Sequence, residues 1–131
     1  MDVKTLADKY FRAWEMRDLD AIMALHTPDT IFCSYMGQET VTGSKAVREV
    51  FAGLMQMIPD ISFKAWDMRF GEDFWVAQMI MSGTRRLSGG ADTGISTNSV
   101  DVIQVREGLV FRKDSYVDSV RLFSQLGSAA A

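Results

Sequence analysis

The sequence predicts an α+β protein in which one strongly curved, antiparallel or mixed β-sheet wraps around three helices from the N-terminal half. Apolar residues recur at helical spacing along most of the first half of the chain and at alternating spacing in the second half. The order is helix, helix, short strand pair, helix, and then four long strands joined by short turns. Helices followed by strands are typical of α+β proteins, and short turns imply antiparallel neighbours. Because such a sheet twists strongly, it can curl into a cone that helices close on one side.

The first two helices have clear start signals. Asp2 and Asp18 each precede an apolar pattern with three- and four-residue spacing. Their carboxylates can accept hydrogen bonds from the free N–H groups of a first helical turn. The first helix is predicted to end near Met16, and the second to stop at residues 27–29, which contain a proline. We expect His26 to lie at the end of the second helix and to interact with that helix C-terminus.

A short strand pair and a third helix follow. Residues 30–35 are rich in strand-forming side chains, and a return strand is predicted over residues 39–42. Ser44 is predicted to cap the third helix, because its hydroxyl can accept a hydrogen bond from the first turn. Pro59 ends the apolar stripe of this helix, since proline removes a backbone donor.

The second half of the chain alternates between apolar and polar residues. Residues 61–66 alternate, and residues 74–83 are apolar on both faces, which predicts a central strand covered on both sides. Two further strands are predicted over residues 96–106 and 109–118, with a final helical turn over 120–126. These four strands complete the predicted sheet.

The last two strands carry polar side chains in line with apolar neighbours. Because strand side chains alternate with period two, Asn98 shares a face with Val100 and Val102. By the same rule, Lys113 and Ser115 share an apolar face of the following strand, over residues 109–118. Burying such a group without a partner costs about 1–3 kcal/mol. These side chains therefore leave the interior, find partners or line a cavity, and the cavity would indicate a protein that binds a small molecule.

Composition excludes several classes of protein. The chain has 131 residues, a net charge of −3 and interspersed acids and bases, which argues against nucleic-acid binding and a polybasic membrane anchor. No apolar run reaches the ~20 residues of a membrane helix, and charged residues interrupt the N-terminal segment as they would not in a signal peptide. One cysteine and one histidine cannot form a disulfide or a structural zinc site. We expect a cytoplasmic protein without metal or cofactor, with one domain over residues 1–126 and a disordered tail over 127–131.

Several local strings, in this order of elements, resemble the SnoaL-like branch of the nuclear-transport-factor-type superfamily, which includes ketosteroid isomerases and limonene epoxide hydrolases. The strings span nearly the whole chain and are 10–22 (YFRAWEMRDLDAI), 27–29 (TPD), 43–47 (GSKAV), 58–60 (IPD), 100–105 (VDVIQV) and 116–127 (YVDSVRLFSQLG). The resemblance implies a cone-shaped α+β barrel of the cystatin-like kind. It also implies a homodimer that forms through the outer face of the sheet.

The ketosteroid isomerase branch gives the sharpest expectation for a site. Matched strings place its oxygen-polarising donors on Tyr10 and Asn98, and we expect these two residues to be catalytic. The carboxylic acids of the ketosteroid isomerase and polyketide cyclase branches match Ser34 and Ser115 instead, so a steroid-isomerase mechanism in its usual form is not expected. These serines are expected to make room for a ligand.

Four other charged residues are expected to lie at the edge of the predicted cavity or outside it. By parity, Asp114 and Asp118 lie opposite to Ser115, although a β-bulge could turn one of them inward. Asp101 is expected on the dimer or solvent face, and Lys113 is expected to reach the rim of the cavity with its charged end in water.

Two functions remain open at this point. The first is a cofactor-free isomerase, cyclase or hydrolase that acts on a hydrophobic, polycyclic or terpenoid- or polyketide-like substrate. The second is a non-catalytic ligand-binding or dimerisation module of the same fold. For either function, the residues predicted to contact the ligand are Trp14, Ser34, Met55, Trp75, Met79, Met81, Ser115 and Val117.

Overall fold

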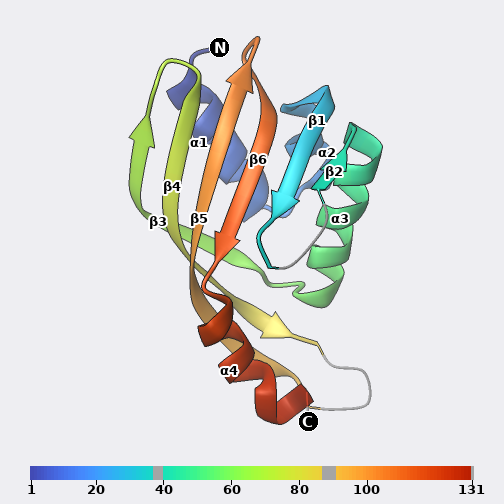
Figure 1. Ribbon diagram of the computed structural model, residues 1–131. Coiled ribbons are helices and arrows are strands. Elements are labelled where there is room, and N and C mark those ends of the chain that lie inside the picture. Colours follow the sequence, from blue (N-terminus) through green and yellow to red (C-terminus); the bar gives the residue numbers. More distant parts are fainter. Residues whose placement is uncertain (37–39, 87–90, 131) are drawn as a thin grey trace.

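The computed structural model describes residues 1–36, 40–86 and 91–130. Within them, six strands form one curved, open sheet, and four helices accompany it (Figure 1). The elements in chain order are α1 (Val3–Glu15), α2 (Leu19–Ala24), β1 (His26–Ser34), β2 (Thr40–Thr42), α3 (Ser44–Met57), β3 (Ser62–Phe70), β4 (Phe74–Arg85), β5 (Thr93–Arg106), β6 (Leu109–Val117) and α4 (Ser119–Ala130). The predicted α+β class with a curved sheet is confirmed.

Both N-terminal helices begin as the sequence predicts. The carboxylates of Asp2 and Asp18 each accept a hydrogen bond from the backbone N–H three residues later, at 2.7 and 3.0 Å. The third helix differs from the prediction, because Gly43 occupies its cap position and Ser44 is the first helical residue. Gly43 has a φ of 95°, a conformation that glycine adopts without steric cost.

The sheet is mixed, with the strand order β2-β1-β6-β5-β4-β3. β1 runs parallel to β6, and the other described neighbours are antiparallel. β1 begins at His26 rather than at residue 30, so the predicted helix stop at 27–29 lies inside a strand. His26 pairs with Val110, and Ile31 pairs with Arg112. The register of β1 against β6 therefore shifts between these two pairs. His26 therefore belongs to the sheet and does not lie at a helix terminus, as the sequence had suggested.

A β-bulge in β6 decides which of its side chains point inward. Gln104 pairs with Arg112 and Val105 pairs with Val110, so Phe111 is an extra residue on β6. Because of this insertion, Val110 and Lys113 are both buried although they are three positions apart. The prediction that every second residue over 109–117 shares one face is therefore wrong at the bulge. Every second residue faces the pocket only from Lys113 onward.

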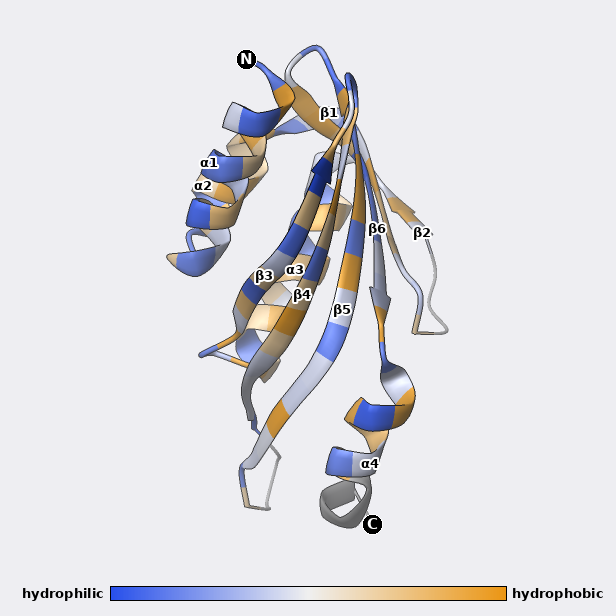
Figure 2. Cartoon of the chain, turned by 90° about the vertical axis from the view of Figure 1, so that its left-hand side faces the viewer, coloured by the Kyte–Doolittle hydropathy of each residue, from blue (hydrophilic) through white to orange (hydrophobic). Residues whose placement is uncertain are grey.

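The main core lies between the concave face of the sheet and the helices α1 and α3. Figure 2 shows α1 and α2 on one side of the sheet, with apolar residues interleaved among polar ones along each element. Fully buried residues from the sheet and from α1, α2 and α3 meet here. They include Leu6, Ile22, Val47, Phe51, Trp75 and Ile103. None of the helices in the described part of the chain is both long enough and apolar enough to cross a bilayer.

A second apolar cluster closes the far end of the molecule. Leu122 of α4 packs there with Ile58, Ile61, Met81 and Ile95. The helical turn predicted after β6 is thus a longer helix, which continues through positions 127–130 of the expected tail, and residue 131 lies outside the described residues. This cluster gives the curved sheet a cover at the end opposite to the N-terminus (Figure 1).

Gly83 of β4 tests how tightly this cluster is packed. A Cβ atom at this position would lie 2.4 Å from Cγ2 of Ile58 and 3.3 Å from the Cα of Ile61. We expect Gly83→Ala to lower the free energy of unfolding by about 1–3 kcal/mol, because overpacking displaces these neighbours. The control is Gly53→Ala in α3, where no atom lies within 4 Å of the new Cβ. Gly53→Ala should raise the free energy of unfolding by about 0.5–1 kcal/mol, as measured by urea unfolding. Similar effects of both variants would contradict the close contact between Gly83 and Ile58.

Candidate functional site

An apolar pocket of about 320 Å³ lies within the curve of the sheet. This volume falls within the range of small-molecule sites, about 300–1,000 Å³. Its walls come from α1, α3, α4 and the strands β1, β3, β4, β5 and β6. Five aromatic side chains contribute to the apolar wall, namely Trp14, Phe32, Phe51, Phe63 and Phe123.

Lys113 forms part of the pocket wall with an ammonium group that is almost completely buried. The residue is 5% exposed, which contradicts its predicted position at the rim. Its Nζ donates a hydrogen bond of 3.2 Å to the hydroxyl oxygen of Tyr10. The same nitrogen lies 4.5 Å from the ring centroid of Trp14 and 5.0 Å from that of Phe51. Aromatic faces attract a cation at such distances, so the ring cluster helps to hold the charge in the interior.

Asp101 supplies the opposite charge. Its Oδ2 lies 3.6 Å from Nζ of Lys113, and its Oδ1 accepts a hydrogen bond of 2.6 Å from the Ser115 hydroxyl. β5 and β6 bring these groups together because Asp101 and Ser115 are paired in register. The prediction that Asp101 faces the dimer or solvent side is wrong, since its side chain lines the pocket.

Lys113 is a cation in this environment. Burial acts to lower the pKa of Lys113, but the interactions with Tyr10 and Asp101 outweigh it, and the pKa is raised. Burial also raises the pKa of the Tyr10 hydroxyl, so this group is neutral at pH 7. The site therefore combines a positive charge with a neutral phenol, and Lys113 is not a free amine nucleophile.

Tyr10 connects this charged pair to His26. The Tyr10 hydroxyl lies 2.9 Å from Nε2 of His26, and Nδ1 of His26 lies 2.8 Å from the hydroxyl of Thr30. Burial lowers the pKa of His26 to about 3, and the positive charge of Lys113 acts in the same direction. Since its ordinary pKa is 6.5, His26 is neutral throughout the physiological range.

The structure places most of the predicted ligand contacts around cavities. Trp14, Ser34, Met81, Ser115 and Val117 line the main pocket. Two others, Trp75 and Met79, line a cavity of about 20 Å³ beside Tyr10, and Met55 packs against the main core. Their contact with a ligand stays a prediction.

Asn98 does not face the pocket. It is exposed on the opposite face of β5, where it pairs with Ile80, so it cannot act with Tyr10 on a bound oxygen. The predicted donor pair is therefore wrong. Alternation defined the two faces of the strand, but it could not show which face turns inward. The inner face carries Thr97, Ser99 and Asp101 instead.

The two other acids considered from the sequence also have structural partners. Arg112 donates two hydrogen bonds to the Asp114 carboxylate, at 2.9 and 3.0 Å, and Tyr35 donates a third at 3.0 Å. Asp118 is exposed and accepts a hydrogen bond from the backbone N–H of Arg121 in α4. The bulge in β6 thus brings neither carboxylate into the pocket, and Asp101 is the acid that lines it.

Two buried polar atoms belong to residues that line the pocket. The hydroxyl oxygen of Ser99 and Nε1 of Trp14 have no hydrogen-bond partner among the described residues. Both residues line the main pocket and are at most 5% exposed. Because an unpaired buried polar atom costs about 1–3 kcal/mol, a ligand oxygen or bound water would relieve this cost.

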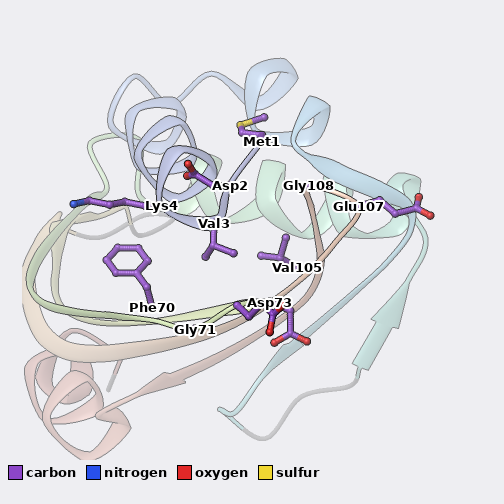
Figure 3. Close-up of a pocket in the computed structure, with 11 residues that line it drawn as sticks. Met1, Asp2, Val3, Lys4, Phe70, Gly71, Asp73, Val105, Glu107 and Gly108 are labelled. Carbon is purple, nitrogen blue, oxygen red and sulfur yellow. The ribbon is translucent and has the colours of Figure 1, made fainter.

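A larger hollow of about 750 Å³ lies at the opposite end of the molecule (Figure 3). It is bordered by the N-terminus, the turn between β3 and β4, and the turn between β5 and β6. Its acidic lining residues are Asp2, Glu72, Asp73 and Glu107. All four are exposed, so their charges are screened by solvent. In the described part of the chain, no group of three acidic, histidine or cysteine residues is arranged to hold a metal ion.

Most of the chain matches a known protein family. A family model for the SnoaL-like domain matches residues 7–113. The chain belongs to the SnoaL-like domain family. No curated protein matches its sequence.

Solved structures confirm the fold of this SnoaL-like domain. A protein from Shewanella denitrificans, proposed to be a SnoaL-like polyketide cyclase, has a TM-score of 0.85 at 14% identity, covering 95% of this chain and 96% of that one. A Catenulispora acidiphila protein with a ketosteroid isomerase-like fold, in complex with trimethylamine, scores 0.81 at 16% identity over 93% and 92%. The epoxide hydrolase/cyclase-like enzyme SalBIII of salinomycin pyran-ring formation scores 0.80 at 21% identity over 90% and 92%.

The buried neutral state of His26 predicts a loss of stability in acid. Because its pKa is about 3 when folded and 6.5 when exposed, the unfolded chain binds more protons between these pH values. Stability should therefore fall as the pH falls through this window, by about 3 kcal/mol between pH 7 and pH 4 from this residue. Urea unfolding of the wild type and of His26→Gln should show a shallower pH dependence for the variant. Equal pH dependence of the wild type and the variant would contradict the buried neutral state of His26.

Proposed function

We propose that this SnoaL-like domain is a cofactor-free enzyme that isomerises, cyclises or hydrolyses a hydrophobic small molecule of polycyclic or terpenoid- or polyketide-like character. The observation that carries this proposal is the pairing of a buried cation, Lys113, with a carboxylate, Asp101, on the wall of an apolar pocket. Sites of this kind, apolar with a few convergent polar groups, are the usual form of small-molecule active sites.

Asp101 and Lys113 are suited to complementary roles. The Asp101 carboxylate can take a proton from a carbon next to a carbonyl group, or from a water molecule. As the proton leaves that carbon, electrons move onto the carbonyl oxygen, and the ammonium of Lys113 stabilises the negative charge that develops there. Return of the proton from Asp101 to another carbon completes an isomerisation without a net change in the enzyme.

The pairing of Lys113 with Asp101 favours a substrate with a neutral oxygen at this part of the pocket wall. Lys113 carries three N–H donors, of which one binds Tyr10 and another faces Asp101. The third can bind a carbonyl or hydroxyl oxygen of the substrate, and the Ser99 hydroxyl offers a further partner. The apolar side chains of Phe32 and Phe51 would hold the carbon skeleton.

The energetics of the charged pair support a functional role. Apolar residues of similar size often replace a buried ion pair without loss of stability. The fold thus has no evident need for Lys113 and Asp101 in its interior. A pair that contributes little to folding is expected where it serves binding or catalysis.

Substitution of Lys113 tests the ligand site. We expect Lys113→Met to weaken the binding of 2-naphthol, a neutral phenol, by about tenfold or more, because the charged donor is lost. The free energy of unfolding should fall, because the Asp101 carboxylate then lies in the interior without its cationic partner. Isothermal titration calorimetry and urea unfolding measure the two effects. The control is Lys64→Met at an exposed position of β3, and equal affinity in all three proteins would overturn the site.

A second arm of this experiment separates an enzyme from a binding module. Asp101→Asn should lower the turnover of a β,γ-unsaturated ketone or a cyclic epoxide by about 10²–10⁴-fold, because the proton acceptor is lost. Turnover is followed by ultraviolet absorbance or chromatography, with Lys64→Met again as the control. Tight 2-naphthol binding together with no turnover of either substrate class by the wild type would favour the non-catalytic alternative.

We also propose that two copies associate through the outer face of the sheet. Phe74 and Tyr116 are exposed there, and Val76 and Val100 on the neighbouring strands are half-buried. Val100→Asp should convert a dimer to a monomer in size-exclusion chromatography with light scattering, because it introduces a charge at the centre of this apolar face. Lys9→Glu, at an exposed position of α1 and therefore on the other side of the sheet, serves as the charge-change control. A monomeric wild type would contradict the dimer.

A further inference from the structure

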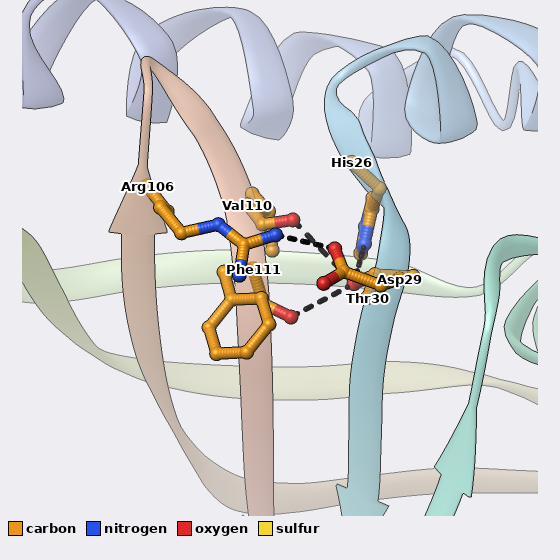
Figure 4. A network of polar contacts seen from close by, with 6 residues as sticks. All are labelled: His26, Asp29, Thr30, Arg106, Val110 and Phe111. Carbon is orange, nitrogen blue, oxygen red and sulfur yellow. Dashed lines mark hydrogen bonds and ion pairs between the residues drawn. The ribbon is translucent and has the colours of Figure 1, made fainter.

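A chain of buried hydrogen bonds leads from the pocket wall into the protein. It begins at Nζ of Lys113, which lies 3.2 Å from the Tyr10 hydroxyl. It continues over 2.9 Å to Nε2 of His26 and from Nδ1 over 2.8 Å to the hydroxyl of Thr30. The Thr30 hydroxyl ends the chain at the backbone carbonyl of Phe111, at 3.1 Å (Figure 4). Four side chains from α1, β1 and β6 thus form one continuous path.

The direction of each hydrogen bond follows from the two ends of this chain. A lysine ammonium can only donate, so the Tyr10 oxygen is an acceptor toward Lys113. At the other end, the carbonyl of Phe111 can only accept, so the Thr30 hydroxyl gives its proton to that oxygen. The Thr30 oxygen is then an acceptor for the N–H at Nδ1 of His26. Because a neutral histidine carries one N–H, Nε2 is left to accept the proton of Tyr10.

The opposite arrangement of His26 would be costly. A proton on Nε2 would point at the Tyr10 oxygen, which already accepts from Lys113. The Tyr10 proton would then have no acceptor within this chain, and an unpaired buried donor costs about 1–3 kcal/mol. The low pKa of His26, which results from burial, excludes the doubly protonated form near neutral pH. Geometry and charge therefore agree on a neutral ring with its proton on Nδ1.

We propose that His26 is a positioning residue for Lys113. By accepting the proton of Tyr10, it turns a lone pair of the Tyr10 oxygen toward the ammonium and holds that cation at the pocket wall. Thr30 acts one step further away, because it fixes which nitrogen of His26 can accept. Tyr10 is thereby an acceptor for Lys113 rather than a donor to the ligand, which differs from the role that the sequence suggested. The contact between Lys113 and a ligand rests on the proposed function, whereas the direction of the hydrogen bonds does not.

The single histidine of the chain makes this direction measurable in the wild type. Nitrogen-15 NMR of the ring should show one neutral tautomer, protonated at Nδ1 and unprotonated at Nε2, from pH 8 down to pH 5. A ring protonated at Nε2, an equal mixture of tautomers, or a titration near the ordinary histidine pKa would overturn the proposal. This measurement needs no ligand and no substitution.

Substitution of Thr30 tests whether the direction matters for the pocket. Thr30→Val keeps the shape of the side chain and removes the acceptor for Nδ1, so the Nε2-protonated tautomer should appear. We expect 2-naphthol to bind about tenfold more weakly, because Lys113 loses a fixed acceptor. Thr30→Ser keeps the hydroxyl and should restore both the tautomer and the affinity. Wild-type tautomer and affinity in Thr30→Val would overturn the positioning role.

The two proposals fail in different ways. If 2-naphthol does not bind the wild type, the ligand site and its positioning by His26 are both overturned, while the tautomer still decides the direction of the chain. If 2-naphthol binds and depends on Lys113 but the ring is protonated at Nε2, the site stands and the role of His26 falls.

Discussion

The burial of one ammonium group, that of Lys113, constrains most of the candidate site. Removing a charge from water costs several kcal/mol, and the cost falls only when partners of suitable charge and geometry surround it. Asp101 provides the opposite charge, Tyr10 provides an oxygen acceptor, and aromatic rings cover the remaining sides. These partners come from β5, α1 and α3. The helices must therefore pack on the sheet in one arrangement for the lysine to be tolerated, and the same arrangement leaves an apolar pocket beside it.

Backbone geometry delivers the charged group to that position. The extra residue Phe111 in β6 resets the alternation, so that Lys113 points toward the helices. The register between β5 and β6 then places Ser115 across from Asp101. On the neighbouring strand, β1 begins early enough to include His26, whose ring reaches Tyr10. Local irregularities in pairing thus position the polar groups, as is common for bulges near functional sites.

Burial acts on two basic side chains of this site with opposite results. His26 lies among hydroxyl groups, and desolvation lowers its pKa until the ring is neutral. Lys113 is at least as buried, but its interactions with Asp101 and Tyr10 raise its pKa. The difference arises from their partners rather than from exposure, since opposite charge and hydrogen bonding to the charged form can outweigh desolvation. The result is one fixed positive charge and one neutral relay within a few ångströms.

The sequence by itself determined the fold class, the helix caps at Asp2 and Asp18, the order of the elements along the chain and the family, because these follow from local spacing and matched strings. It also indicated that polar groups on the last two strands had to find partners or line a cavity. It could not decide which face of β5 turns inward, because alternation is symmetric between the faces. That choice belongs to the tertiary structure, in which the bulge at Phe111 and the packing of α1 turned Asp101 and Lys113 toward the interior and left Asn98 in solvent.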